Sequence, residues 1–205
     1  MNDERDSTTE PGRRLFLKSL GVAGAAGTAM LTTPEAESAA ADAPPPGSLD
    51  ITLTVNKESR KLRVEPRTTL LDALRIRLEP AVTGPKLVCG EGTCGACTVL
   101  INDKTAYACL VLAVDAVGKS ITTVEGLGSM EAMSPLQAAF VEKDGLMCGF
   151  CTPGFVTSLT ALLRKNPSPN EHQVRAACHG NFCRCGTYPR VFEAALAAAK
   201  QTAKG

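Results

Sequence analysis

The sequence predicts an α+β protein whose first half is rich in strands and whose second half is helical. Residues 51–55 alternate apolar and polar side chains, as a half-buried strand does, and short segments of this kind recur before residue 126. Beyond that point, the sequence contains several helix start signals, each of which combines a capping residue with a proline or a glutamine. Eight of the nine cysteines form two sets of four, one set in each half. We therefore expect two domains, at residues 50–126 and 127–205.

The composition is that of an ordinary globular protein with an aliphatic core. Apolar residues make up 44% and charged residues 21% of the 205 residues, while tryptophan is absent and aromatic residues reach only 4%. The formal net charge is +1, whereas a protein that tracks nucleic-acid phosphates would carry a basic stripe. We therefore expect no nucleic-acid partner.

Residues 1–41 have the three parts of an export signal. The pair Arg13–Arg14 lies in the charged start, a Gly- and Ala-rich apolar stretch covers residues 19–31, and small residues follow. The arginine pair is typical of the twin-arginine type of signal. We place the cleavage after Ala41, with residues 39–41 as the A-x-A site.

Two other interpretations of this segment stay open, namely a disordered tail with a chance arginine pair and a single-pass membrane anchor. The apolar run is short and Gly-rich compared with the roughly 20 residues that span a bilayer. Twin-arginine substrates typically fold and receive their cofactors before export. We therefore expect a periplasmic protein that is exported folded and has no stable membrane span.

A linker at residues 42–49, interrupted by three prolines and a glycine, precedes the strand-rich domain. We expect a hairpin of strands 51–55 and 60–64 joined by a turn at residues 56–58. Thr68 or Thr69 can cap the helix that follows. Its apolar positions are Leu70, Leu71, Leu74 and Ile76, and the later strands are expected at residues 98–101, 104–108 and 120–124.

The first cysteine set lies in a glycine-punctuated loop after this helix and in the segment beyond it. Its spacing, with four, two and eleven residues between successive cysteines, matches a plant-type [2Fe–2S] loop, in which one cluster takes four thiolates. Zinc and disulfides are the alternatives, although zinc sites usually pair two C-x2-C knuckles and only one is present. A mixed sheet with one crossing helix and this loop describes a β-grasp ferredoxin. The expected ligands of the first cluster are Cys89, Cys94, Cys97 and Cys109, with Gly90, Gly92 and Gly95 allowing the backbone to wrap closely.

Four helices are expected in the second domain. Ser134 with Pro135 and Gln137 indicates the start of the first, and Asn170 with Gln173 starts the third through the same capping pattern. The second is expected to start at Thr152–Pro153 and the fourth to run over residues 190–200, opened by Tyr188–Pro189.

The second cysteine set lies on two loops that flank these helices. The loops can bring four thiolates to one end of a four-helix bundle, where helix N-termini favour an anionic group. From spacing alone, iron, zinc and copper all remain open. The expected ligands are Cys148, Cys151, Cys183 and Cys185.

Three further residues lie near this set in the sequence. Cys178 is expected to be a buried mid-helix thiol that acts as a small apolar residue. His179 is expected at the surface or at a helix end, since Rieske centres use a pair of histidines. Arg184, between two expected ligands, either offsets cluster charge, contacts an anionic group of a partner, or is simply solvated.

Three motifs together resemble the iron–sulfur subunit of molybdenum hydroxylases, the xanthine oxidase family. They are Cys-Gly-Glu-Gly-Thr-Cys-Gly-Ala-Cys at 89–97, Cys-Gly-Phe-Cys-Thr-Pro-Gly at 148–154 and Gly-Asn-Phe-Cys-Arg-Cys-Gly-Thr-Tyr at 180–188. The resemblance implies a second [2Fe–2S] cluster and an electron-transfer role. It also implies a large subunit that binds molybdopterin cytosine dinucleotide, near the helical-domain cluster. An FAD-binding medium subunit or a cytochrome would be the acceptor, beyond the ferredoxin-like cluster.

The chain departs from that family pattern at two places. Met147 stands where the family commonly has a glutamine that contacts the pterin, which puts that side-chain hydrogen bond in doubt. Gly186 and Thr187 stand in swapped order, a variant associated with isoquinoline-oxidoreductase-like and other exported members.

No catalytic residues are expected, because the sequence offers no nucleophilic triad or acid–base carboxylate pair. Oxidation of an aldehyde or an N-heterocycle would then take place on a partner. Two alternatives remain open, a free-standing exported ferredoxin and a disulfide-stapled periplasmic binding module.

Overall fold

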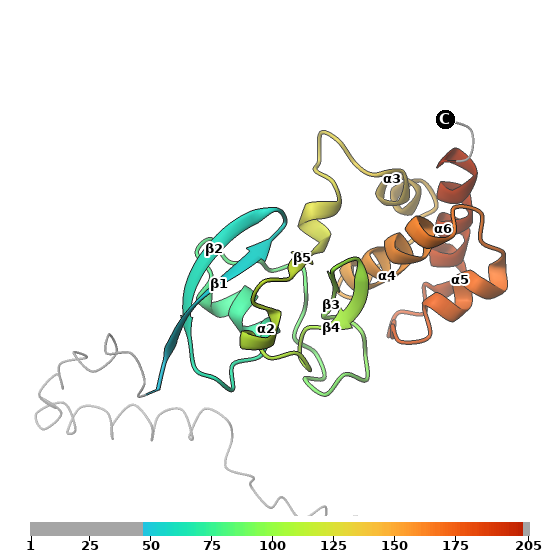
Figure 1. Cartoon of the computed structure of the whole chain (residues 1–205). Coiled ribbons are helices and arrows are strands. Elements are labelled where there is room, and N and C mark those ends of the chain that lie inside the picture. Colours follow the sequence, from blue (N-terminus) through green and yellow to red (C-terminus); the bar gives the residue numbers. More distant parts are fainter. Residues whose placement is uncertain (1–46, 203–205) are drawn as a thin grey trace, which may run out of the picture. The chain divides into compact units, whose positions relative to one another are not determined.

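The computed structural model describes residues 47–202, so the expected signal peptide and most of the linker lie outside the described residues. The first part of the described chain is a five-stranded mixed sheet with strand order β2-β1-β5-β3-β4 (Figure 1). The first and last strands along the chain, β1 and β5, pair in parallel, while the other neighbours are antiparallel. The strands are β1 (Leu49–Val55), β2 (Glu58–Val64), β3 (Thr98–Ile101), β4 (Lys104–Tyr107) and β5 (Ser120–Thr122).

The β1–β2 hairpin forms as its sequence predicts. Asn56 and Lys57 adopt φ values of 51° and 72°, the left-handed pair that a two-residue turn needs to match the twist of its strands. Leu53 and Val55 are buried in the core of the sheet domain, whereas Thr52 is exposed and Thr54 is less buried than its neighbours. The alternating pattern at residues 51–55 therefore does mark one buried face of a strand.

The helix after the hairpin is shorter than expected and changes its winding. Thr69 caps it, since its hydroxyl accepts a hydrogen bond from the Asp72 N–H, but α2 covers only Leu70–Asp72. A π-helical turn, Ala73–Arg77, continues it and is closed by the Leu78 N–H, which donates to the carbonyl of Ala73. Ile76, one of the apolar positions expected on this helix, lies in the wider turn and is 65% exposed, so it does not contribute to the core.

The second part of the described chain contains the four expected helices. Both predicted capping boxes are present, at Ser134 with Gln137 and at Asn170 with Gln173. The second helix begins at Thr152, as predicted, with Cys151 at its N-cap. The helices are α3 (Pro135–Glu142), α4 (Thr152–Lys165), α5 (Glu171–Ala177) and α6 (Tyr188–Thr202).

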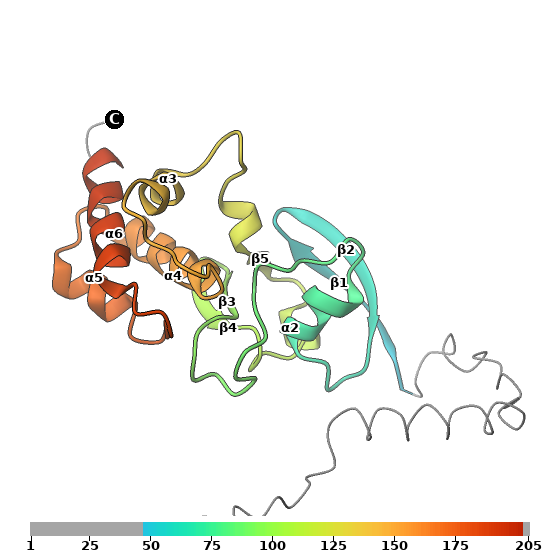
Figure 2. The same ribbon diagram turned by 180° about the vertical axis from the view of Figure 1, so that it is seen from behind.

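The two parts of the described chain have separate apolar cores, one under the sheet and one among the helices. Helix α4 nevertheless packs against strands β3 and β4, as both views of the ribbon show (Figure 2). Strand β3 starts directly after Cys97, and α4 starts directly after Cys151. This packing therefore brings the ends of two cysteine-bearing loops together. No helix within residues 47–202 is long and apolar enough to cross a membrane.

Candidate functional site

The first four cysteines gather around the loop between the π-helical turn and β3. The sulfurs of Cys97 and Cys109 lie 3.4 Å apart, and both residues are buried. Cys94 interacts electrostatically with Cys97 and shares a hydrogen bond with Cys89, so the four thiols form one group. We call it the first thiol group. The three predicted glycines of the loop all adopt positive φ, between 68° and 78°, as the tight wrapping requires: Gly90, Gly92 and Gly95.

The surroundings of this group favour the thiolate form at its outer edge, whereas its inner side is dry. A hydrogen bond from the backbone N–H of Glu91 lowers the pKa of Cys89 to about 6. Burial raises the pKa of Cys97 to about 12, because a charge there would lose its water. An anionic group that spread its charge over all four sulfurs would thus meet an N–H donor on one side and apolar packing on the other.

The other four cysteines gather where the α3–α4 loop meets the α5–α6 loop. The sulfurs of Cys148 and Cys185 lie 3.4 Å apart and are exposed, while Cys151 shares a hydrogen bond with Cys183. Cys148 also interacts with Cys183, which joins the two pairs into the second thiol group. Helices α4 and α6 begin beside it, at Thr152 and Tyr188, with the positive ends of their dipoles near the sulfurs.

Hydrogen bonds to sulfur distinguish the members of the second thiol group. Burial raises the pKa of Cys183, but hydrogen bonds from the side chain and backbone of Thr187 outweigh it and bring the value to about 7. The Thr187 hydroxyl lies 3.1 Å from that sulfur. Burial raises the pKa of Cys151 to about 12, and the backbone N–H of Phe150 lowers the pKa of Cys148.

The remaining three candidates are not members of either thiol group. Cys178 is buried, as expected, but it caps the C-terminus of α5 rather than lying mid-helix. Its pKa is raised to about 12 by burial alone, with no contribution from another thiol. His179 is exposed just beyond the helix end, and Arg184 is exposed between the two ligand candidates.

The geometry of the two groups suits binuclear clusters. The nine cysteines are all free, and separations of 3.4 Å within the closest pairs exceed the roughly 2.05 Å of a disulfide. Within residues 47–202, no three His, Cys, Asp or Glu side chains converge on a single ion site. A [2Fe–2S] cluster does not need three ligands at one ion, because each of its two irons binds two thiolates. Each group contains one close sulfur pair, Cys97 with Cys109 in the first and Cys148 with Cys185 in the second. Each pair fits one iron, and the other two thiols of the group lie beside it.

Sequence reasoning missed a set of polar residues that join the two thiol groups. Asn181 is buried and donates from Nδ2 to the carbonyl of Gly95 at 3.0 Å, while its Oδ1 accepts from the hydroxyl of Ser158 at 2.8 Å. The backbone N–H of Phe182 donates to the carbonyl of Cys94 at 2.9 Å. The Gly-Asn-Phe that precedes Cys183 was visible in the sequence, but the Gly95 partner of Asn181 lies 86 residues away.

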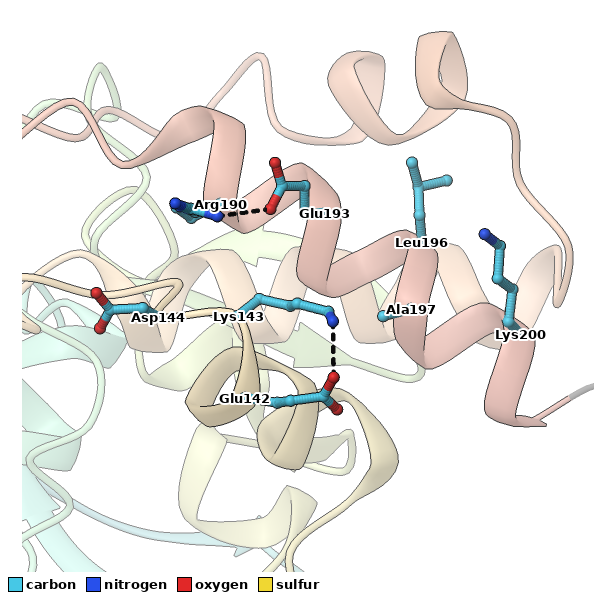
Figure 3. A pocket seen from close by; sticks show the side chains of 8 residues that line it. All are labelled: Glu142, Lys143, Asp144, Arg190, Glu193, Leu196, Ala197 and Lys200. Atoms are coloured by element: carbon cyan, nitrogen blue, oxygen red, sulfur yellow. Dashed lines mark hydrogen bonds and ion pairs between the residues drawn. The ribbon is translucent and has the colours of Figure 1, made fainter.

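Other hollows of the surface do not contain the expected ligands. A groove of about 850 Å³ lies between the end of α3 and one side of α6 (Figure 3). Its three acidic and three basic side chains balance, and Glu142–Lys143 and Arg190–Glu193 pair within it. The groove therefore has no charge preference that would indicate a ligand.

Comparisons with known proteins match each half of the chain to a domain family. Residues 53–119 match the family of 2Fe-2S iron-sulfur cluster binding domains, and residues 123–196 match the [2Fe-2S] binding domain family. The chain is 41% identical to the aldehyde oxidoreductase iron-sulfur-binding subunit PaoA of Escherichia coli (strain K12) over 174 residues, which is 78% of this chain and 75% of that protein. It belongs to the iron–sulfur small subunits of the molybdenum hydroxylases.

Further members of this family support the assignment. The nicotine 6-hydroxylase small subunit of Paenarthrobacter nicotinovorans is 46% identical over 157 residues, covering 77% of this chain and 93% of that one. Among solved structures, quinoline 2-oxidoreductase from Pseudomonas putida 86 matches with a TM-score of 0.72 and 40% identity, over 78% of this chain and 98% of the matched chain. The iron–sulfur subunit is thus part of a molybdenum-dependent oxidoreductase, and its role there is electron transfer.

Proposed function

We propose that this iron–sulfur subunit holds two [2Fe–2S] clusters and relays electrons out of a molybdenum hydroxylase. The observation that carries the proposal is the gathering of eight of the nine cysteines into two separate groups of four. When bound, a [2Fe–2S] cluster takes up and releases a single electron at a potential that hydrogen bonds to sulfur adjust. The ligands are the two sets named above, at the ferredoxin-like domain of residues 50–126 and at one end of a helix bundle in residues 127–205.

The residues of this chain would bind and tune each cluster. The thiolates of each group supply its ligands, and the N–H groups of Glu91 and Phe150 donate to the sulfurs of Cys89 and Cys148. The buried residues Cys97 and Cys109 keep water from the inner side of the first group. Such N–H donors stabilise added negative charge, and the dry packing keeps solvent away from the cluster.

The second thiol group faces the molybdopterin-binding large subunit in this proposal. Its Cys148 and Cys185 are exposed, whereas every cysteine of the first group is at least half-buried. Exposed apolar side chains surround it, namely Met147 and Phe150, and a groove of about 640 Å³ beside it is lined mostly by apolar atoms. Large exposed apolar patches mark contacts with other proteins.

The first thiol group would pass electrons onward. Leu87 and Val88 precede Cys89 and are more than half exposed, as is Leu110 beside Cys109. This second apolar surface suits an acceptor, either an FAD-binding medium subunit or a cytochrome. The partner with molybdopterin cytosine dinucleotide would carry out the oxidation of an aldehyde or an N-heterocycle, so this chain needs no catalytic residue of its own.

Metal analysis combined with electron paramagnetic resonance tests the proposal. The purified complex is expected to contain about four irons per copy of this chain and to show two distinct signals after reduction. A protein with about two irons and one signal, or with zinc in place of iron, would contradict it. Purification as a monomer without a molybdenum-containing partner would instead favour a free-standing electron carrier.

We further propose that the subunit is exported to the periplasm by the twin-arginine route. The support is the charged, apolar and small-residue order of residues 1–41 with its pair Arg13–Arg14. Replacing both arginines by lysine keeps the charge but removes the recognition pair, so the chain is expected to stay in the cytoplasm. Fractionation of cells that express each form measures this, and equal periplasmic amounts would disprove the export route.

A further inference from the structure

The segments that carry the two thiol groups meet along a seam in which backbone touches backbone. On one side lies the tip of the first cysteine loop, Cys94–Gly95; on the other lie Gly154, in the first turn of α4, and the segment Gly180–Phe182. A Cβ atom on Gly95 would collide with the carbonyl oxygen of Gly180, and one on Gly154 would collide with the carbonyl oxygen of Gly95. The seam is therefore packed as closely as two backbones allow.

One hydrogen bond in the seam links a cysteine of the first group to the residue that precedes a cysteine of the second group. The N–H of Phe182 donates to the carbonyl oxygen of Cys94 at 2.9 Å, and Phe182 is bonded to Cys183. A single hydrogen bond and one peptide unit thus join a member of the first group to a member of the second. Any shift of the seam would change both this contact and the distance between the groups.

Asn181 is the side chain that crosses the seam. It is 6% exposed, and its two polar atoms have complementary partners, because the Gly95 carbonyl accepts from Nδ2 and the Ser158 hydroxyl donates to Oδ1. The Gly95 oxygen can only accept, which determines the orientation of the amide. It also accepts from the N–H and the hydroxyl of Thr98, at 3.1 and 2.6 Å.

The amide of asparagine suits this position better than the side chains of similar size. Aspartate would place a second acceptor against the Gly95 carbonyl oxygen. Leucine would make neither the hydrogen bond to that oxygen nor the one from the Ser158 hydroxyl. Tyr107 adds a second tie, since its hydroxyl donates to the Gly180 carbonyl at 3.2 Å. That bond holds Gly180, however, whereas the Asn181 side chain bonds directly to Gly95 at the tip of the first cysteine loop.

We propose that Asn181 is a positioning residue that fixes the spacing between the two thiol groups, an inference that rests on the proposed function of both groups as cluster sites. It binds the tip of the first cysteine loop to the segment that leads into Cys183. Through this contact it keeps the Phe182-to-Cys94 hydrogen bond closed. Asn181 touches no expected ligand sulfur, so its effect on electron transfer is through geometry.

The test compares the complex with wild-type chain to the complex with Asn181→Asp. Both are expected to retain about four irons per chain, because no ligand is removed. The magnetic splitting between the two reduced clusters, which depends steeply on their separation, is expected to shrink or broaden beyond recognition in the variant. Hydrogen exchange of the peptide that contains Phe182, followed by mass spectrometry, is expected to become at least about tenfold faster.

Two further variants make the result decisive. Asn170→Ala removes the cap of α5 and weakens the helical half without touching the seam, so its splitting is expected to equal that of the wild type. Ser158→Ala removes only the hydroxyl that holds the Asn181 oxygen, and an intermediate acceleration of exchange, about threefold, is expected even if Asn181→Asp fails to fold.

The outcomes separate this inference from the function on which it rests. Two normal signals with unchanged splitting and unchanged exchange in Asn181→Asp would overturn the role of Asn181 and leave the function intact. The role of Asn181 would also be overturned if Asn170→Ala altered the splitting as much as the seam variants. Absence of two iron–sulfur signals in the wild-type complex would overturn the proposed function itself, and the inference with it.

Discussion

Replacing Cys183 by alanine is expected to lower the iron content of the subunit from about four to about two atoms per chain. Cys183 is 5% exposed, shares a hydrogen bond with Cys151 and lies 3.1 Å from the hydroxyl of Thr187. A cluster that loses this ligand would keep only Cys151 at the inner side of its site. Iron analysis and electron paramagnetic resonance of the reduced protein are expected to show one signal lost and the other retained.

The matched control is Cys178→Ala. Cys178 is also a buried cysteine of the helical part, at 3% exposed, but no other thiol affects its pKa. Its replacement is expected to keep all the iron and to lower the free energy of unfolding by about 1 kcal/mol, the usual effect of removing one buried heavy atom. If Cys178→Ala lost iron and Cys183→Ala did not, the ligand set of the second group would be wrong.

Replacing Gly95 by alanine is expected to have the largest effect on folding. Gly95 has a φ of 68°, a conformation that costs an L-residue about 1–2 kcal/mol. Its Cβ would also collide with the carbonyl of Gly180 and lie 2.7 Å from Nδ2 of Asn181, and such overpacking costs about 1–3 kcal/mol. The free energy of unfolding is expected to fall by about 2–5 kcal/mol, with loss of the first cluster.

Gly90→Ala separates these two causes. Gly90 lies in the same loop with a φ of 71°, but its nearest neighbour is a side-chain carbon of Leu87 at 3.8 Å. Its replacement is expected to cost only the conformational part, about 1–2 kcal/mol, and to retain the iron. Chemical denaturation and iron analysis measure both effects. Equal losses for the two variants would show that the seam contributes nothing at Gly95.

The parts of the fold that depend on neighbouring residues were predictable from the sequence. The hairpin follows from alternation and from Asn56–Lys57, which adopt the left-handed turn. The capping boxes at Ser134 and Asn170 need only three consecutive positions beyond the cap, so they can be recognised without tertiary information. The exposed position of Ile76 could not be foreseen, because it depends on how the preceding helix is wound against the sheet.

The candidate site shows the same division. Spacing alone predicts the first thiol group, because its first three cysteines share one loop whose pattern is local. The second group combines two loops separated by 31 residues, so spacing left iron, zinc and copper open, and the resemblance of its motifs indicated iron. Asn181 and Ser158 could not be assigned a role, since their partners are set by the packing of α4 on β3. The boundary between the two domains near Gly126 remains a prediction.

The order of the strands has a consequence for biosynthesis. Strand β1 borders the strand made last, β5, and the tip of the first cysteine loop is braced by residues 180–182. Residues 180–182 must therefore be synthesised before the first thiol group gains its full support. We expect cofactor insertion to follow the synthesis of this segment, because the segment contacts the first cysteine loop and leads directly into Cys183.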